Sequence, residues 1–354
     1  MTPPTFEDIV AAHEFIAPYL PKTPLVRVAK LSEELGCDYY VKLENLQPTG
    51  AFKVRGGVNL VGHEVSGYRT ESGSDRIDHS IDDATNQPTL ITASTGNHGQ
   101  SIAYGGRLFD MRVIIYAPSE NVNESKMQAM RDLGAEVRLH GRDFDEARLE
   151  CERVASAEGF RYVHSANEPH LIAGVGTIGL EIFEDLPDVD VIVAPAGGGS
   201  CASGNCIVAN KINPRVRVIA VQSAEAPAMW HAWRNRTLDP YPTNETEHEG
   251  LATRVPFELT NKILWDLLDD FVLVTDKEIN DSIGLLARHA KQVAEGAGAA
   301  SLAAAIKLRD QSVRSPAVRE GLRGKKVVGI LTGGNIPLDR FAKLMNVKSN
   351  QAAR

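Results

Sequence analysis

Three short segments carry residue types that could hold an anionic group beside a reactive amine. They are KLENLQPTGAFKVRGG (42–57), ASTGNHGQS (93–101) and APAGGGSCASG (194–204). Each segment lies at a predicted junction between a strand and a helix. Ligand sites of open α/β sheets gather at such junctions, so these segments are the candidates for a ligand site.

The glycine-rich loop suits an anion. Gly197, Gly198, Gly199 and Ser200 follow the apolar run DVIVA and open a predicted helix, so several backbone N–H groups and a helix N-terminus can point at one phosphate. A dinucleotide site uses the same device, but the next strand ends at Gln222 without an acid for a ribose hydroxyl, which disfavours NAD. Glycine loops also occur for close packing alone, so this loop does not decide the chemistry.

Lys53 and the polar turn supply the remaining groups. Lys53 follows a Pro-Thr-Gly turn at the predicted start of a helix. A solvated surface lysine is the ordinary case, but desolvation beside Phe52 and an anion would lower the pKa of its amine, which could then attack an aldehyde and act as a base. The turn Ser94 to His98 offers hydroxyls, an amide and N–H groups for a carboxylate, although plain turns have a similar composition.

The elements that must position these groups form βαβ units from about residue 89 onward. Short β-branched runs alternate with longer amphipathic segments, which predicts parallel sheets buried on both faces. The predicted strands are TLITA, VIIYA, AEVRL, DVIVA, RVIAV, FVLVT and VVGIL. Helical spacing is found at 144–157 and 277–293, whereas 62–88 is polar and aperiodic and predicts a long surface insertion or mobile loop.

Composition narrows the class of protein. The 354 residues are 43% hydrophobic and 24% charged, which suits a globular chain with two subdomains. A net charge of −8 without a basic run argues against nucleic acid, and no run approaches the roughly 18 apolar residues of a membrane span. We expect a cytoplasmic protein. Cys37, Cys151, Cys201 and Cys206 form no CxxC, so neither disulfides nor structural zinc is expected.

The ordered set of motifs resembles one family. AFKVRGG, STGNHGQ, GGGS, AEGAGAAS (294–301) and LTGGN (331–335) occur in this order, as in threonine dehydratase and serine racemase, which are tryptophan synthase β-like, fold type II pyridoxal phosphate enzymes. The resemblance covers about 6–344. It implies an α/β fold of two open parallel-sheet domains with the cofactor between them. The large domain would be 1–54 with 156–354, and the small mobile domain 55–155.

The resemblance also implies roles for individual residues. Lys53 would carry pyridoxal 5′-phosphate covalently, with Phe52 behind the ring and Asn97 at its 3-hydroxyl. The implied phosphate site is Gly197, Gly198, Gly199, Ser200 and Cys201, and the other implied cofactor contacts are Gly250, Glu295 and Thr332, the last against the pyridine nitrogen. The implied substrate carboxylate site is Ser94, Thr95, Asn97 and His98. Ser94 and Thr95 join Lys53 as candidate catalytic residues.

The implied reaction is loss of water from a β-hydroxy amino acid, L-threonine or L-serine first, to give a 2-oxo acid and ammonia. A hydroxyl at Thr332 cannot strongly favour a protonated pyridine, which agrees with β-elimination rather than transamination. Thr95 leaves racemisation of serine or aspartate open. The motifs also suit a dehydratase of 3-hydroxyaspartate or phenylserine, a β-replacement synthase, and a non-catalytic cofactor-binding protein.

Two further expectations concern metal and assembly. Some relatives bind a divalent cation through acidic residues after the strand that corresponds to RVIAV. This chain has Gln222 and Ala228 at the matching places, so no metal is expected there, although Glu225 lies between them. The family resemblance implies a homodimer or homotetramer, and the partner is a small amino-acid substrate.

Overall fold

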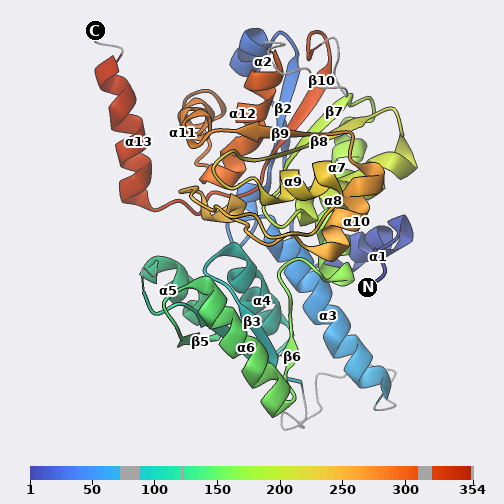
Figure 1. The fold of residues 1–354 in the computed structure, drawn as a ribbon. Helices are drawn as coiled ribbons and strands as arrows, with labels where there is room; N and C mark the ends of the chain where they lie inside the picture. Colours follow the sequence, from blue (N-terminus) through green and yellow to red (C-terminus); the bar gives the residue numbers. More distant parts are fainter. Residues whose placement is uncertain (72–87, 121–122, 310–320, 352–354) are drawn as a thin grey trace.

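Two β-sheets flanked by helices organise the computed structural model (Figure 1), which describes residues 1–71, 88–120, 123–309 and 321–351. The six-stranded sheet has the order β1-β2-β10-β7-β8-β9, and the four-stranded sheet has the order β5-β4-β3-β6. All neighbouring strands run parallel except β1 and β2. The predicted α/β class with two parallel sheets is confirmed.

All seven predicted strands are present. The large sheet contains β1 (Leu25–Arg27), β2 (Asp38–Leu43), β7 (Val191–Pro195), β8 (Arg217–Ser223), β9 (Asp270–Val274) and β10 (Lys326–Leu331). The small sheet contains β3 (Leu90–Ala93), β4 (Val113–Ala117), β5 (Glu136–Leu139) and β6 (Arg161–Tyr162). The sequence missed β1, β2 and β6. Strands β1 and β6 are short, and Lys42 interrupts the apolar pattern of β2 although its side chain is fully buried.

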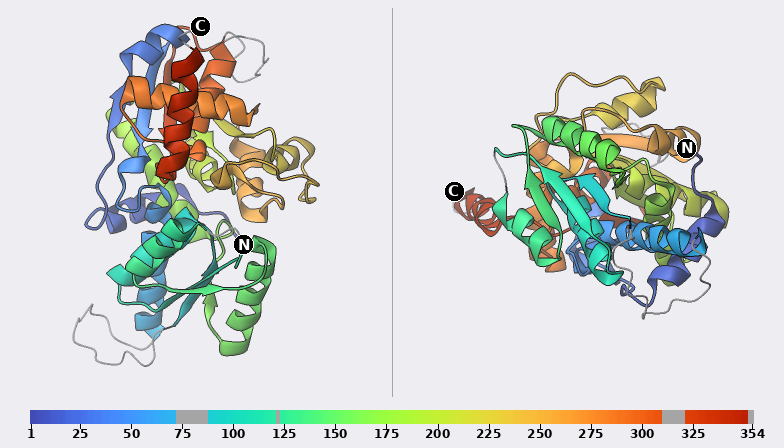
Figure 2. Two further views of the ribbon diagram at one scale, coloured as in Figure 1. Left: turned by 90° about the vertical axis from the view of Figure 1, so that its left-hand side faces the viewer. Right: turned by 90° about the horizontal axis from the view of Figure 1, so that it is seen from below.

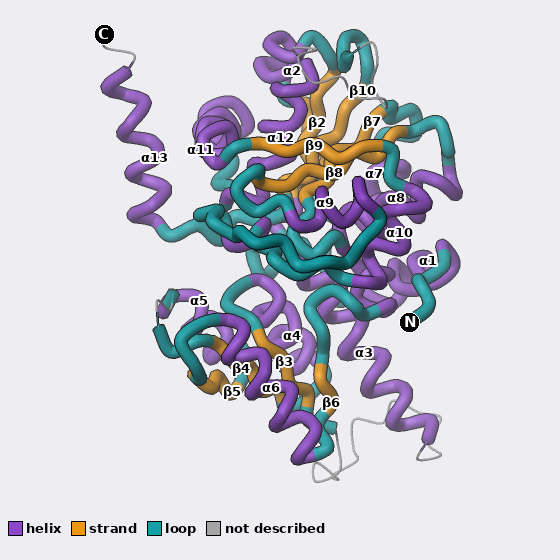
Figure 3. The backbone as a smooth tube through the Cα atoms, in the orientation of Figure 1, coloured by secondary structure: helices purple, strands orange, loops and turns teal. Residues whose placement is uncertain are grey.

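Helices cover both faces of the six-stranded sheet, as the tube in Figure 3 shows. Val191 and Val193 of β7 face a core shared with one set of helices, while Ile192 and Ala194 face the other core, as the two-residue period of a strand requires. The first set is α2 (Ala29–Leu35), α11 (Asp276–Leu285) and α12 (Gly296–Arg309). The second set is α7 (Pro169–Asp185), α8 (Ser200–Ile212) and α10 (Glu258–Leu267).

The four-stranded sheet is covered in the same way. Helix α6 (Phe144–Glu158) packs on Ile91 and Ile114 through Cys151. The opposite face receives α3 (Lys53–Glu71), α4 (Asn97–Leu108) and α5 (Glu124–Asp132). The remaining elements are α1 (Phe6–Ile16), α9 (Ala228–Asn235), α13 (Leu338–Gln351), η1 (Glu44–Leu46), η2 (Glu249–Leu251) and a π-turn over Leu286–Ala290. Helix α13 packs on the large lobe through Phe341, Leu344 and Met345, and its C-terminal end projects away from the molecule in Figure 1.

Two predictions about the helical segments need correction. The expected insertion at 62–88 is wrong for 62–71, because α3 continues to Glu71. Its polar composition conceals a packed face, since a Cβ at Gly62 would lie 2.1 Å from the Phe15 ring and Glu64 pairs with Arg161. Residues 72–87 lie outside the described part. The helix expected over 277–293 ends earlier, because the π-turn is followed by Lys291 with φ +58°.

The two sheets lie in separate lobes that are stacked in Figure 2. We call the six-stranded sheet with its helices the large lobe, and the four-stranded sheet with its helices the small lobe. Helix α3 leads from the large lobe to the small one, and residues 163–168 lead back into α7. This path supports a division near the predicted one, 1–54 with 156–354 and 55–155, but α6 runs to Glu158 and β6 pairs with β3, so the small lobe extends past residue 155. Among the described helices, none is both long and apolar enough to cross a bilayer.

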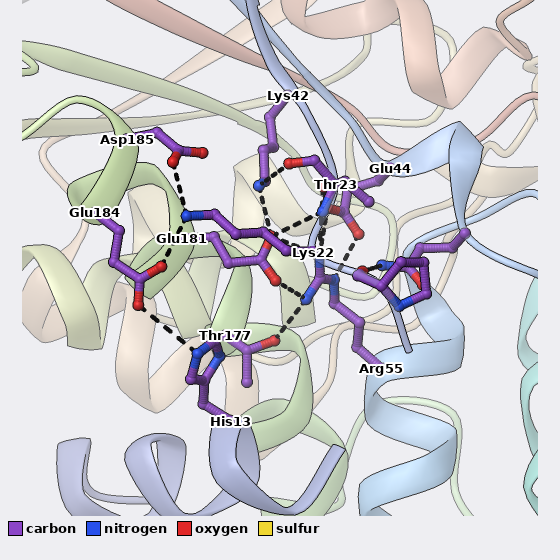
Figure 4. Close-up of polar contacts among 12 residues, drawn as sticks. His13, Lys22, Thr23, Lys42, Glu44, Arg55, Thr177, Glu181, Glu184 and Asp185 are labelled. Carbon is purple, nitrogen blue, oxygen red and sulfur yellow. Dashed lines mark hydrogen bonds and ion pairs between the residues drawn. The ribbon is translucent and has the colours of Figure 1, made fainter. Parts of the chain in front are cut away.

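A buried ionic network anchors the start of α3 (Figure 4). Arg55 binds Glu44 through Nε (2.7 Å) and Nη2 (2.9 Å), and it binds Glu181 of α7 through Nη1 (2.7 Å) and Nη2 (2.9 Å). Lys42 Nζ lies 2.5 Å from Glu181 Oε2. Although burial alone would raise the pKa of Glu181, the charges of Arg55 and Lys42 lower it. Two cations and two anions therefore balance inside the large lobe.

Replacing Arg55 by Met should strongly destabilise the protein, because Glu44 and Glu181 would remain buried without their main cation. The expected loss is about 3–5 kcal/mol in the free energy of unfolding, measured by urea denaturation. The control is Lys22→Met, which removes a cation from the half-exposed pair with Glu184 and Asp185 and should cost less than about 1 kcal/mol. Similar losses in both variants would contradict the assignment.

Candidate active site

The structure brings every candidate site residue of the sequence to one cavity of about 340 Å³ between the lobes. The residues are Phe52, Lys53, Ser94, Thr95, Asn97, His98, Gly197, Gly198, Gly199, Ser200, Cys201, Gly250, Glu295 and Thr332. Strands β3 and β7 end at this cavity, and α3, α4 and α8 begin there. We call this space the cofactor cavity. The structure thus places these residues together, and the individual role of each remains a prediction.

Lys53 lies at the first residue of α3, where two backbone contacts fix its position. The Phe52 N–H donates to Thr332 O at 2.9 Å, and Ala51 forms a bridge with Gly333. The Lys53 Nζ lies 3.3 Å from Ser200 Oγ and 3.4 Å from Ser165 O. Burial lowers the pKa of Lys53 to about 8. The amine is therefore neutral in a much larger fraction of molecules than a solvated lysine.

The glycine loop forms a cradle that larger side chains would fill. Gly199 has φ +87°, and a Cβ at Gly197 would lie 2.2 Å from Gly250 O. Helix α8 begins at Ser200, directly after the loop. The free N–H groups of its first turn favour an anion at the cavity. This arrangement fits the phosphate of pyridoxal phosphate.

Thr332 offers a hydroxyl for which the cavity has no partner. Its side chain is 2% exposed, and Oγ1 makes no hydrogen bond to any residue in the described part of the chain. A buried hydroxyl without a partner is costly, so a ligand atom is the natural partner. A pyridine nitrogen, which accepts a hydrogen bond, fits this position. The residues present thus suit the cofactor at its phosphate, at its ring nitrogen and at the amine of Lys53.

Asn97 is held in one orientation by Asn335, a residue that the sequence did not single out. Asn335 Nδ2 donates to Thr49 O (2.9 Å) and to Asn97 Oδ1 (2.8 Å). Because a backbone carbonyl can only accept, Asn97 must present its NH₂ on the other side. There Nδ2 lies 2.6 Å from Glu295 Oε1, and burial raises the pKa of Glu295. Only its place in LTGGN could have drawn attention to Asn335.

The polar turn is built around Ser94. Its Oγ accepts hydrogen bonds from the N–H groups of Gly96 (3.2 Å) and Gly99 (2.8 Å), so this hydroxyl shapes the turn. Helix α4 begins at Asn97, and its first N–H groups suit a carboxylate. His98 is buried, its Nε2 lies 3.0 Å from Thr92 Oγ1, and burial lowers its pKa to about 3. A carboxylate contact from His98 would therefore involve a neutral ring.

A second residue missed in the sequence is Lys126 of α5, which lines the cavity. Its Nζ lies 2.6 Å from Oε2 of Glu249 in η2. Lys126 belongs to the small lobe and Glu249 to the large lobe. This ion pair therefore joins the two lobes at the cofactor cavity, beside the polar turn. Nothing in the local sequence marks this lysine, because α5 has the composition of an ordinary amphipathic helix, with Met127 and Met130 buried and charged residues on its exposed side.

One acidic cluster bears on the expectation of no metal. Ligand atoms of Glu247, His248 and Asp276 lie within 4.8 Å of one another. Arg340 Nη2 lies 3.2 Å from His248 Nδ1, and since a guanidinium only donates, the ring proton lies on Nε2 and cannot be replaced cheaply by a metal. Gln222, at the place of a family metal ligand, instead accepts from the N–H groups of Met229 and Trp230. Absence of a metal stays a prediction.

Comparison with known proteins places the chain in a family. A family model described as "Pyridoxal-phosphate dependent enzyme" matches residues 16–333. An L-threonine ammonia-lyase of Thermotoga maritima is 36% identical over 97% of this chain and 78% of its own. A catabolic L-threonine dehydratase of Staphylococcus aureus is 33% identical over 95% of this chain and 90% of its own. The structure of maize serine racemase has a TM-score of 0.83 at 26% identity, covering 98% of this chain and 99% of its own.

The fold and the cavity define a fold type II pyridoxal phosphate enzyme, and the chain belongs to the pyridoxal-phosphate dependent enzyme family. The resemblance inferred from the ordered motifs is confirmed, as is pyridoxal phosphate as the cofactor.

The lowered pKa of Lys53 predicts how fast the cofactor-free protein takes up pyridoxal phosphate at different pH. Only the neutral amine attacks the aldehyde, so the rate should rise with pH and level off above a midpoint near 8, rather than near the ordinary lysine value of 10.5. Stopped-flow absorbance of the bound cofactor measures this rate. Lys53→Met serves as the blank, and a midpoint above about 10 would contradict the burial of the amine.

Proposed function

We propose that this protein is a pyridoxal phosphate-dependent dehydratase, an ammonia-lyase that converts a β-hydroxy amino acid, first L-threonine or L-serine, to a 2-oxo acid and ammonia. The observation that carries the proposal is the buried amine of Lys53, whose pKa is lowered to about 8 and which lies in one cavity with a phosphate cradle and a polar turn suited to a carboxylate. The threonine ammonia-lyase and dehydratase among the relatives support the same reaction.

The bound cofactor would withdraw electrons from the α-carbon of the amino acid and so acidify its α-proton. Lys53 is the base in this proposal. Burial keeps its pKa at about 8, close to the operating pH, which suits a group that must take up a proton and return it. Ser165 O and Ser200 Oγ, at 3.4 and 3.3 Å, would hold the amine while it is free of the cofactor.

The substrate carboxylate would bind at the polar turn. The first N–H groups of α4, with Thr95 and Asn97 beside them, provide donors, while Ser94 Oγ holds the turn through Gly96 and Gly99. In this arrangement Ser94 acts mainly by shaping the turn, and Thr95 is the hydroxyl that remains for substrate or proton transfer.

Loss of the β-hydroxyl requires a proton, because hydroxide is a poor leaving group. Ser200 Oγ, next to Lys53, is a hydroxyl of the chain that could relay one. The hydroxyl of Thr332, which has no partner in the described part of the chain, supports elimination over transamination, since it would donate to a ring nitrogen without stabilising a positive charge there. Water leaves as the α-proton and β-hydroxyl depart, and hydrolysis of the released enamine gives the 2-oxo acid and ammonia.

The alternative within the same fold is a racemase of serine or aspartate. It would need a proton donor on the face opposite Lys53, and Thr95 lines the cavity with a hydroxyl suited to that role. The likeness to maize serine racemase supports this alternative. Dehydration of 3-hydroxyaspartate or phenylserine is a variant of the main proposal that differs only in the β-substituent.

Assembly and compartment are also part of the proposal. We expect a homodimer or homotetramer that acts in the cytoplasm on a small amino acid, with neither nucleic acid nor a membrane as its partner. The acidic net charge of −8 supports the absence of a nucleic-acid partner.

The lobes 1–54 with 156–354 and 55–155 are proposed to close over the substrate. The Lys126–Glu249 pair joins them beside the polar turn, and water exclusion would protect the reactive intermediates.

Turnover of β-hydroxy amino acids tests the proposed reaction directly. The holoenzyme should release 2-oxo acid and ammonia in equal amounts from L-threonine or L-serine, and Lys53→Ala should lower the rate by at least about 10⁴-fold, because both base and cofactor anchor are lost. Coupled assays of the two products, with chiral analysis of the remaining amino acid, provide the measurement. Inverted amino acid without 2-oxo acid would assign a racemase instead.

Closure predicts slower hydrogen exchange when an unreactive amino acid binds. With L-alanine, amides of the polar turn (93–101) and of α5 (Glu124–Asp132) should exchange about threefold or more slowly in the holoenzyme. Lys126→Met should weaken this protection, because the cross-lobe ion pair is lost. Central strand β7 is the internal reference, since its exchange should not change. Identical exchange with and without L-alanine would argue against closure.

A further inference from the structure

A second cavity of about 600 Å³ adjoins the cofactor cavity. The two spaces share lining residues, among them Ala93, Phe144, Ser165, Thr253 and Phe257. We call the second space the side chamber. The proposed reaction with threonine or serine leaves it without a role, because their β-carbons carry only a methyl group or hydrogen besides the hydroxyl.

The side chamber lies where the β-substituent of a bound amino acid would point. The base must lie within about 3–3.5 Å of the α-proton it removes, so the α-carbon would lie close to Lys53 Nζ. That nitrogen is 3.4 Å from Ser165 O, and Ser165 lines both spaces. With the carboxylate at the polar turn, a substituent on the β-carbon would extend toward the residues that the two spaces share.

Small residues border the passage between the two spaces. Ala93, Ser165 and Ala252 line both. Bulkier side chains here would fill the passage, as isoleucine or phenylalanine would. Small side chains therefore make up part of the boundary between the two spaces, beside Phe144 and Phe257.

One part of the chamber lining is aromatic, beside polar and charged residues. The rings of Tyr162, His164 and Phe257 form an edge-to-face series, with centroids 6.3 Å apart for Tyr162 and His164 and 5.1 Å apart for His164 and Phe257. His164 Nδ1 accepts the N–H groups of Ala166 and Asn167, both at 3.0 Å, which fixes its ring. Because Nδ1 accepts these bonds, it carries no proton, and burial lowers the pKa of His164 in the same sense. Phe144, 40% exposed, contributes from the small lobe.

Three of the four charged lining residues, Asp145, Arg148 and Arg254, take part in ion pairs, and the fourth, Asp143, caps α6 through the Glu146 N–H. Arg254 Nη2 lies 3.1 Å from Asp145 Oδ2, and Arg148 lies 2.7 Å from Glu152 and 3.7 Å from Asp145. An anionic substituent such as the second carboxylate of 3-hydroxyaspartate would have to displace these partners. An uncharged substituent leaves them intact and removes apolar surface from water.

We propose that the side chamber binds an uncharged aryl-sized β-substituent, so that the preferred substrates are β-hydroxy amino acids of the 3-phenylserine class. An apolar cavity of about 150 Å³ already accepts benzene, and the chamber is about 600 Å³. Edge-to-face contacts with Tyr162, His164 and Phe257 would add to the burial of the ring. This inference rests on the proposed dehydratase function and specifies its substrate class.

The kinetic test compares L-threo-3-phenylserine, L-threonine and L-threo-3-hydroxyaspartate as substrates of the holoenzyme. We expect kcat/KM for phenylserine to exceed that for threonine by about tenfold or more, since even one methylene in an apolar pocket is worth about that factor. A higher kcat/KM for threonine or for 3-hydroxyaspartate than for phenylserine overturns the proposal.

A pair of matched variants separates the chamber from general effects. Val255 is 44% exposed and lines only the side chamber, whereas Val26 of β1 is 42% exposed and lines neither space. Val255→Trp should lower kcat/KM for phenylserine by about tenfold or more while leaving threonine within about twofold. Val26→Trp should leave both unchanged. Equal losses for both substrates in Val255→Trp overturn the assignment of the chamber.

Binding without turnover keeps this inference distinct from the proposed function. L-Phenylalanine carries an aryl β-substituent but no β-hydroxyl, so its affinity does not depend on elimination. Calorimetry with the holoenzyme should give about tenfold or more tighter binding of L-phenylalanine than of L-alanine, and Val255→Trp should abolish the difference. If no amino acid yields a 2-oxo acid, the dehydratase proposal fails, and the phenylalanine comparison alone supports or overturns the chamber.

Discussion

The hydrogen bond from the Phe52 N–H to Thr332 O, 2.9 Å long, is the contact on which the site depends. With the bridge between Ala51 and Gly333, it joins the segment before α3 to the end of β10. Strand β10 lies between β2 and β7, so the last strand of the chain is near the centre of the sheet. Lys53 and Thr332 therefore enter the same cavity only after distant parts of the chain have assembled.

Two cations near the start of α3 show how partners decide the behaviour of a buried charge. Burial tends to lower the pKa of Arg55, but Glu44 and Glu181 raise it, so this guanidinium stays charged and ties α3 to η1 and α7. Lys53, two residues earlier, has no carboxylate among its contacts in the described part of the chain, and burial lowers its pKa to about 8. The ion pairs of Arg55 hold α3 in place, and Lys53 presents its reactive amine from the same helix, about half a turn away.

Sequence patterns predicted the central strands and the members of the candidate site, but not the contacts made across long separations. DVIVA and VVGIL are apolar because their strands are buried on both faces, so composition alone reveals them. The three motifs supplied most of the residues around the cofactor cavity, because ligand sites gather at strand-to-helix junctions. Lys42 is fully buried because Glu181 of a distant helix neutralises it. Asn335 contacts Asn97, and Lys126 contacts Glu249. No local pattern encodes these pairs, because each joins residues that are far apart in the sequence.

Substrate choice and lobe closure are coupled by the construction of the side chamber. Phe144 belongs to the small lobe, while Val255 and Phe257 belong to the large lobe. A bulky β-substituent would contact residues of both lobes. It would favour the closed state by the difference between its binding free energies to the closed and open states. A methyl group reaches few of these side chains. An aryl substituent would thus favour the closed conformation of the enzyme. The contacts that recognise the substrate would then also promote the reaction at Lys53.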